Sequence, residues 1–181
     1  MKNFAQQMAF YSVYHENKIN IWIHIIGVPI IALGLFMALN FVNFGFKIGP
    51  IHITLASIYF LFVIGYFYIL NVTFALLGTI LYGGIYFLAN HLVFNALDAK
   101  TAIIVACITF FGAFALQFVG HGMFEKKRPA LVDNLFQAFM SAPFFIIVDL
   151  AFEFGLKKNL QKDIADAIKA NETLKEISSK F

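Results

Sequence analysis

The sequence is dominated by uncharged apolar runs that are as long as a bilayer-crossing helix. Four of them cover residues about 21–42, 51–70, 72–97 and 101–119. About twenty apolar residues cross the hydrocarbon core as a helix. With 61% hydrophobic and only 13% charged residues, a soluble domain of 181 residues could not bury its apolar surface. The sequence therefore predicts an all-α polytopic membrane helical bundle, a single integral membrane domain over 1–181.

A fifth apolar segment, residues about 135–154, differs from the four spans because it contains Pro143, Asp149 and Glu153. With the N-terminus inside and four spans, the basic residues satisfy the positive-inside rule. A fifth full span would place the basic tail outside, against that rule. We therefore predict a re-entrant or buried fifth helix, which protein contacts would shield from lipid. A true fifth span with an external tail is the alternative.

The tail, residues 157–181, is predicted to be an amphipathic helix on the membrane surface or against the protein. Apolar residues recur there every four positions, with charges between them. The net charge of +3 is too small for a nucleic-acid surface, so the lipid bilayer is the expected environment. The protein should be multi-pass, in the endoplasmic reticulum of a eukaryote or the inner membrane of a bacterium. The sequence is also compatible with a homo-oligomer.

Ionisable residues in so apolar a chain are its most informative feature. On a helix, Asn17, Asn20 and His24 would share one face. His15 lies nine residues before His24, which at about 100° per residue puts the two on opposite faces of a straight helix. Both reach one site only if the chain bends between them, for which Asn17 and Asn20 are plausible places. The alternative is an interfacial His24 capped by asparagine.

A second polar group ends the fourth span. Gln117, His121 and Glu125 are spaced by four, and glycines on both sides of His121 allow close backbone approach or a helix break. Glu125 could ligate a metal, or accept the second N–H of a ligating histidine. The alternative is a salt-bridged helix end, in which Glu125 pairs with the basic run that follows.

The four-span topology places His15, His24 and His121 at the same membrane face. Three imidazoles near carboxylates indicate a divalent metal, and all-nitrogen ligation with open positions suits iron, zinc or copper. His91 would join them only if a glycine breaks one of the helices. For Asp149 and Glu153, charge pairing is favoured over catalysis.

Two motifs stand out, His15-x-Asn17-x-x-Asn20-x-x-x-His24-x-x-Gly27-x-Pro29 and Gln117-Phe-Val-Gly-His121-Gly-Met-Phe-Glu125-Lys-Lys-Arg-Pro129. Both are similar to motifs of the fungal 2-hydroxy fatty acid dioxygenase family, and the resemblance extends over nearly the whole chain. Lys18 stands where that family often has proline, and Asp149 where it has glutamate. The second difference weakens a catalytic role for Asp149.

The resemblance implies a membrane-bound, Fe(2+)-dependent enzyme of fatty acid α-oxidation. Such enzymes use O2 to shorten a 2-hydroxy fatty acid by one carbon, in fungi during breakdown of the sphingoid base phytosphingosine. The implied iron ligands are His15, His24, His121 and His91. Among the other residues, we assign catalytic roles to Glu125 and Asn20, and binding of the substrate carboxylate to Lys127 and Arg128. The alternative for this basic run, Lys126 included, is that it only anchors the chain by the positive-inside rule.

Two other classes compete with this interpretation. A di-iron desaturase or hydroxylase needs histidines in HxxxH and HxxHH boxes, whereas this chain has five histidines and neither box. A small membrane transporter, or a structural membrane protein, would use the same polar residues for packing. Metal analysis and an assay with a 2-hydroxy fatty acid separate these classes.

Overall fold

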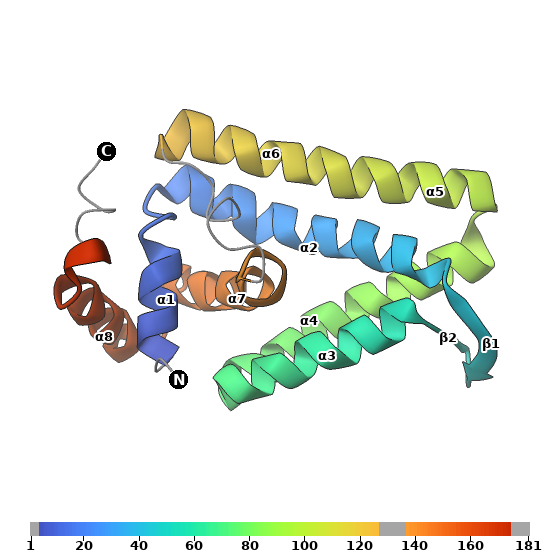
Figure 1. Ribbon diagram of the computed structural model, residues 1–181, viewed down its shortest axis with the longest axis horizontal. Coiled ribbons are helices and arrows are strands. Elements are labelled where there is room, and N and C mark those ends of the chain that lie inside the picture. Colours follow the sequence, from blue (N-terminus) through green and yellow to red (C-terminus); the bar gives the residue numbers. More distant parts are fainter. Residues whose placement is uncertain (1–3, 127–136, 175–181) are drawn as a thin grey trace. The chain divides into compact units, whose positions relative to one another are not determined.

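The computed structural model describes residues 4–126 and 137–174, and most of them are helical (Figure 1). In chain order the elements are α1 (Phe4–Ser12), α2 (Lys18–Asn40), β1 (Asn43–Ile48), β2 (Ile51–Thr54), α3 (Leu55–Leu70), α4 (Val72–His91), η1 (Leu92–Ala96), α5 (Ala99–Cys107), η2 (Ile108–Gly112), α6 (Ala113–Val119), η3 (Gly120–Glu125), η5 (Gln137–Ser141), α7 (Ala142–Glu153) and α8 (Lys158–Lys169). The η elements are π-helical turns, which often occur at functional sites. The all-α class is confirmed, with one short hairpin added.

Three of the predicted spans correspond to helices long and apolar enough to cross a membrane. Within the described residues these are Lys18–Asn40, Val72–Ala96 and Ala99–Glu125. The second predicted span is wrong at its start, because Ile51–Thr54 form β2 instead of helix. The helical part of this second span, α3, has 16 residues and is therefore roughly 24 Å long. It is shorter than a hydrocarbon core of about 30 Å.

The fifth apolar segment contains a sharp bend. Only the combined length of two consecutive helices, Phe139–Glu153 and Lys158–Lys169, is sufficient to cross a membrane. Their axes differ by 118°. The turn between them uses two residues in the left-handed region, Gly155 at φ 70° and Lys157 at φ 57°. This geometry is that of a broken span or a re-entrant segment, and it is compatible with the predicted re-entrant or buried helix.

The contacts of the chain fall into two compact units. The terminal unit comprises Met1–Ile25 and Gln117–Phe181, and the central unit comprises Ile26–Leu116. The single domain over 1–181 stays a prediction.

In the central unit, a core of large and small side chains packs between helices. The larger members are Phe36, Met37 and Tyr86, and alanines of α3, α4 and α5 fill the spaces between them. Phe60 stacks on the Tyr86 ring at a centroid distance of 5.0 Å. Small residues let membrane helices approach closely, which explains why alanines are buried here.

Hydrogen bonds between buried polar side chains hold the elements together at one end of the central unit. Asn40 Oδ1 accepts hydrogen bonds from Thr54 Oγ1 at 2.8 Å and from Asn90 Nδ2 at 3.1 Å. Asn90 also bonds the backbone of His52 in both directions. These bonds connect α2, the hairpin and α4, and they satisfy polar groups whose burial would otherwise cost free energy.

The hairpin of β1 and β2 is absent from the sequence prediction, which left residues 43–50 between two spans and began the second span at about residue 51. Its strands pair Ile48 with Ile51 across a turn of Gly49 and Pro50, and Gly49 has a φ of 58°. Glycine and proline favour such a turn. The ring of His52 stacks on Phe94 at 3.8 Å.

Two helices of the central unit approach each other closely at Gly34. A Cβ added there would lie 2.6 Å from the backbone nitrogen of Phe110 and 2.8 Å from the carbonyl oxygen of Ala106. We expect Gly34→Ala to reduce the free energy of unfolding by about 1–3 kcal/mol, because backbone rather than a flexible side chain must move. Thermal unfolding in detergent measures the change.

The matched control for Gly34→Ala is Gly84→Ala in α4, where nothing lies within 4 Å of the added Cβ. Alanine is the better helix former, by up to about 1 kcal/mol, so this variant should unfold at an equal or higher temperature. Equal unfolding temperatures for Gly34→Ala and the unsubstituted protein would contradict the predicted clash.

In the terminal unit, α1 packs against both α7 and α8. Phe4 meets Phe144 edge to face at 5.7 Å, and Tyr11 contacts Phe145 at 4.9 Å. On α8, Ile164 is buried while the charged face is exposed. The α8 helix therefore lies against the protein, which is one of the two placements predicted for the tail.

Candidate metal centre

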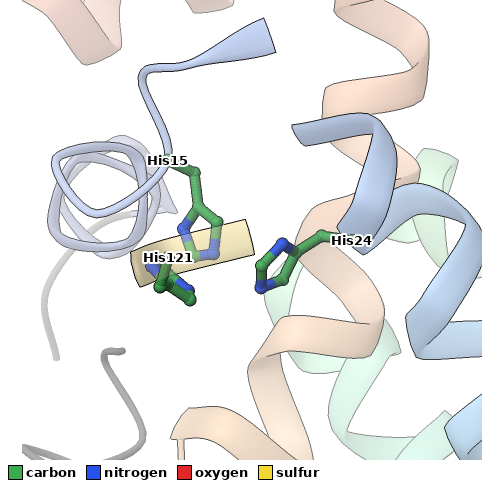
Figure 2. A group of neighbouring side chains, drawn as sticks. All are labelled: His15, His24 and His121. Carbon is green, nitrogen blue, oxygen red and sulfur yellow. The ribbon is translucent and has the colours of Figure 1, made fainter. Parts of the chain in front are cut away.

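Three histidines meet in the interior of the terminal unit. His15 follows α1, His24 lies on α2 and His121 lies in η3, and their rings point toward one another (Figure 2). The ring centroids are 4.4 Å apart for His15 and His24, and 4.9 Å apart for each other pair. The side chains are only 7%, 6% and 2% exposed. One potential ligand atom from each lies within 4.8 Å of the others.

These distances suit a shared ion. Metal–nitrogen bonds of about 2.0–2.1 Å put two donors on one ion roughly 3–4 Å apart. Small side-chain rotations therefore bring the three donors from within 4.8 Å onto one centre. The donor set is three imidazoles without a thiolate, which suits iron, zinc or copper and leaves coordination positions open.

The non-helical turn between α1 and α2 brings His15 and His24 together. The first helix ends at Ser12 and the second begins at Lys18, so the predicted bend between the two histidines is confirmed. Asn17 starts the second helix, since its side-chain oxygen accepts the N–H of Ile19 at 2.9 Å. A continuous helix would have placed the rings on opposite faces.

Backbone carbonyls orient two of the rings. The Nδ1 of His15 lies 3.1 Å from the carbonyl oxygen of Tyr11, and the Nδ1 of His24 lies 2.9 Å from that of Asn20. Because a carbonyl only accepts hydrogen bonds, each Nδ1 carries the proton and donates it. In the neutral ring, Nε2 then keeps a lone pair for a metal.

His121 is held differently. Its Nδ1 is buried and has no hydrogen-bond partner among the described residues. An unsatisfied buried nitrogen is costly unless something fills the site. The arrangement thus fits a bound ion, with two oriented Nε2 atoms and one buried imidazole nitrogen.

Glu125 joins the three ligand-bearing segments. It lies one turn after His121, and its Oε1 accepts the backbone N–H of Glu16 at 2.7 Å. Oε2 accepts Nδ2 of Asn20 at 3.0 Å and the backbone N–H of Asn17 at 3.1 Å. The carboxylate therefore closes the N-terminal end of α2, where a negative charge is favourable. The geometry shows Glu125 and Asn20 as positioning residues, and their predicted catalytic roles stay predictions.

Gly120 allows the close packing on which this arrangement depends. A Cβ there would lie 2.4 Å from Oδ1 of Asn20 and 3.4 Å from the Ile23 side chain. Gln117 bonds the same helix, donating from Nε2 to the carbonyl of Ile23 at 3.2 Å. The close approach predicted from the glycines around His121 is confirmed at Gly120, while Gly122 has open space beside it.

For the other predicted site residues the outcome differs. His91 ends α4 in the central unit and is exposed, so its role as a ligand stays a prediction. Lys127 and Arg128 lie outside the described residues. Asp149 lines a cavity that also contains His15.

Sequence reasoning missed Tyr11. Its carbonyl orients His15, and its ring stacks on the His15 ring at 4.1 Å with an interplanar angle of 17°. The spacing of four residues before His15 was the available signal, because residues four apart share a helix face.

A helical membrane protein with a buried group of three histidines is the class that these observations define. Residues 1–154 match the family described as 2-hydroxy-palmitic acid dioxygenase Mpo1-like. The chain belongs to this family.

Among curated proteins, the chain is similar to the 2-hydroxy-palmitic acid dioxygenase MPO1 of Saccharomyces cerevisiae. The two are 35% identical over 162 residues, which is 87% of each chain. No solved structure matches the sequence. The family match ends at residue 154, so α8 lies beyond it.

Proposed function

We propose that this protein is an Fe(II)-dependent dioxygenase that shortens 2-hydroxy fatty acids by one carbon with O2. The observation that carries the proposal is the buried group of His15, His24 and His121, found in a member of the Mpo1-like family. The relative from yeast is named for activity on 2-hydroxy-palmitic acid, which supports the substrate class.

The overall reaction balances without a further reductant. A 2-hydroxy acid and O2 yield the acid one carbon shorter, CO2 and water. The hydroxyl-bearing carbon loses three electrons as it becomes a carboxyl carbon, and the former carboxyl carbon loses one. O2 accepts all four electrons, so no nicotinamide or flavin is needed.

In this proposal, His15, His24 and His121 hold the iron. When bound, Fe(II) supplies the one-electron chemistry that O2 requires and that side chains lack. The protein orients the imidazoles through the carbonyls of Tyr11 and Asn20. Burial of the three rings excludes water from the reacting groups.

The substrate would approach from the bilayer. Many apolar side chains of the long helices are exposed, which suits contact with lipid and with the acyl chain of the substrate. Lys127 and Arg128 lie two and three positions after Glu125 in the sequence, and we propose that they attract the carboxylate. Arginine and lysine are the usual partners of such a group.

An assay with purified protein tests the proposal. The protein is loaded with Fe(II) and incubated in detergent with 2-hydroxypalmitic acid and O2. We expect mass spectrometry to detect the fatty acid one carbon shorter. No shortened fatty acid should form from palmitic acid, which lacks the 2-hydroxyl, or in a sample without O2. Absence of a shortened product over a range of chain lengths would exclude the proposed reaction.

A further inference from the structure

A metal centre this deeply buried needs a route by which the ion arrives. The side chains of His15, His24 and His121 are at most 7% exposed. Ligands, geometry, outer-shell partners and a path from solvent are the features that make a metal site credible. The three histidines provide the ligands and the geometry, and the carbonyls of Tyr11 and Asn20 are outer-shell partners, so a path from solvent is the remaining feature.

A cavity of about 200 Å³ lies beside His15 within the terminal unit. Its polar wall is formed by Ser12, His15, Asp149, Glu153 and Gln161, and apolar side chains of α2, α7 and α8 complete it. A water occupies roughly 30 Å³ in the liquid, so a divalent cation with a shell of about six waters fits this volume.

The charges on the cavity wall have one sign. Asp149 and Glu153 are one turn apart on α7 and both line the cavity, and no lysine or arginine does so in the part of the chain that the structure describes. An acidic cavity attracts cations and repels the carboxylate of a fatty acid. The cavity is therefore unsuited to the head group of the proposed substrate.

The ionisable residues of the wall differ in how deeply they are buried. Glu153 is exposed, Asp149 is half-buried and His15 is buried. The Asp149 carboxylate interacts with the Tyr11 side chain, and its Oδ2 is shielded from solvent. A buried carboxylate with few donors is costly, and a passing cation would relieve that cost.

We propose that this cavity is the route by which a divalent cation reaches the three histidines, with Glu153 and then Asp149 holding it in transit. The inference rests on the proposed metal site but not on the reaction. Carboxylate oxygens bind a hydrated divalent cation, whereas the imidazoles of His15 and its partners provide the final nitrogen ligands.

The test measures how fast the metal-free protein in detergent binds Co(II), whose visible absorption reports its ligands. In stopped-flow mixing, Asp149→Asn/Glu153→Gln should lower the association rate constant at least tenfold at low salt, since acidic clefts raise on-rates by about 10–10³. The final absorption spectrum and the equilibrium occupancy should remain those of the unsubstituted protein.

The matched control is Asp163→Asn/Asp166→Asn. It removes the same charge from exposed positions of α8 that do not line the cavity. Its association rate should change less than twofold. If the double variant of α7 fails to fold, Glu153→Gln alone keeps the test valid, because that side chain is exposed.

Three results would overturn the proposal. One is an unchanged rate in the α7 variant, and another is an equal decrease in the control, which would indicate a general charge effect. The third is a changed spectrum or occupancy, which would make Asp149 or Glu153 a permanent ligand. Because Co(II) binding needs no turnover, a missing shortened product would reject the dioxygenase proposal without affecting this measurement.

Discussion

Replacing His24 with alanine is expected to abolish stoichiometric iron binding and, with it, formation of the shortened fatty acid. His24 supplies one of three nitrogen donors, and its ring is already oriented by the carbonyl of Asn20. Loss of an outer-shell partner costs about 10–100-fold in metal affinity, and loss of a ligand should cost more. Iron per protein chain, measured by mass spectrometry after dialysis, gives the result.

His52→Ala is the control for this variant. His52 lies in the hairpin of the central unit and stacks on Phe94, so its loss should leave the iron content unchanged. Retention of one iron by His24→Ala would contradict the three-histidine site. In the same series, reduced iron in His91→Ala would add His91 to the ligands, as the sequence predicts.

The second large effect is expected for Glu125→Ala. The substitution removes the acceptor of two backbone N–H groups and of the Asn20 amide. Hydrogen bonds to a charged group contribute about 1.5–3 kcal/mol each, and buried donors left unpaired are costly. We expect the free energy of unfolding to decrease by roughly 3 kcal/mol and the affinity for Co(II) to decrease about 10–100-fold.

Comparison of stability, metal affinity and turnover shows which role Glu125 has. A positioning residue affects all three, because it fixes the segments that carry His15, His24 and His121. If Glu125→Ala folds and binds metal normally yet forms no product, the predicted catalytic role holds and the positioning role is rejected. Glu172→Gln removes an exposed carboxylate from the C-terminal part of the same unit and should change neither stability nor affinity.

Helix-scale features of this fold could be predicted from the sequence because they depend on local composition. The apolar runs identified three helices that are long and apolar enough to cross a membrane, and the spacing of His15 and His24 required a bend between them. The hairpin was missed because an apolar run beginning at Ile51 looks the same whether its first residues form strand or helix.

The contacts of the site were less accessible to sequence reasoning. Glu125 bonds residues more than 100 positions earlier, and no local pattern specifies which donors a distant carboxylate will meet. The sequence suggested a metal ligand, a partner of a histidine or a salt bridge for Glu125. Within the described residues its partners are backbone N–H groups and Asn20, and Lys127 and Arg128 of the basic run lie outside those residues. Such pairing depends on how closely the helices pack, and Gly120 permits close packing because it has no side chain.

The separation in the chain between the two halves of the site also has a consequence for biosynthesis. Asn20 and Glu125 are 105 positions apart, so the histidines cannot converge until the ribosome has passed Glu125. At about 5–20 residues per second, this interval lasts roughly 5–20 s. During that time, a nascent chain holds His15 and His24 but lacks the third donor. If the proposed function holds, iron binding therefore has to wait until the segment that carries His121 and Glu125 has been synthesised.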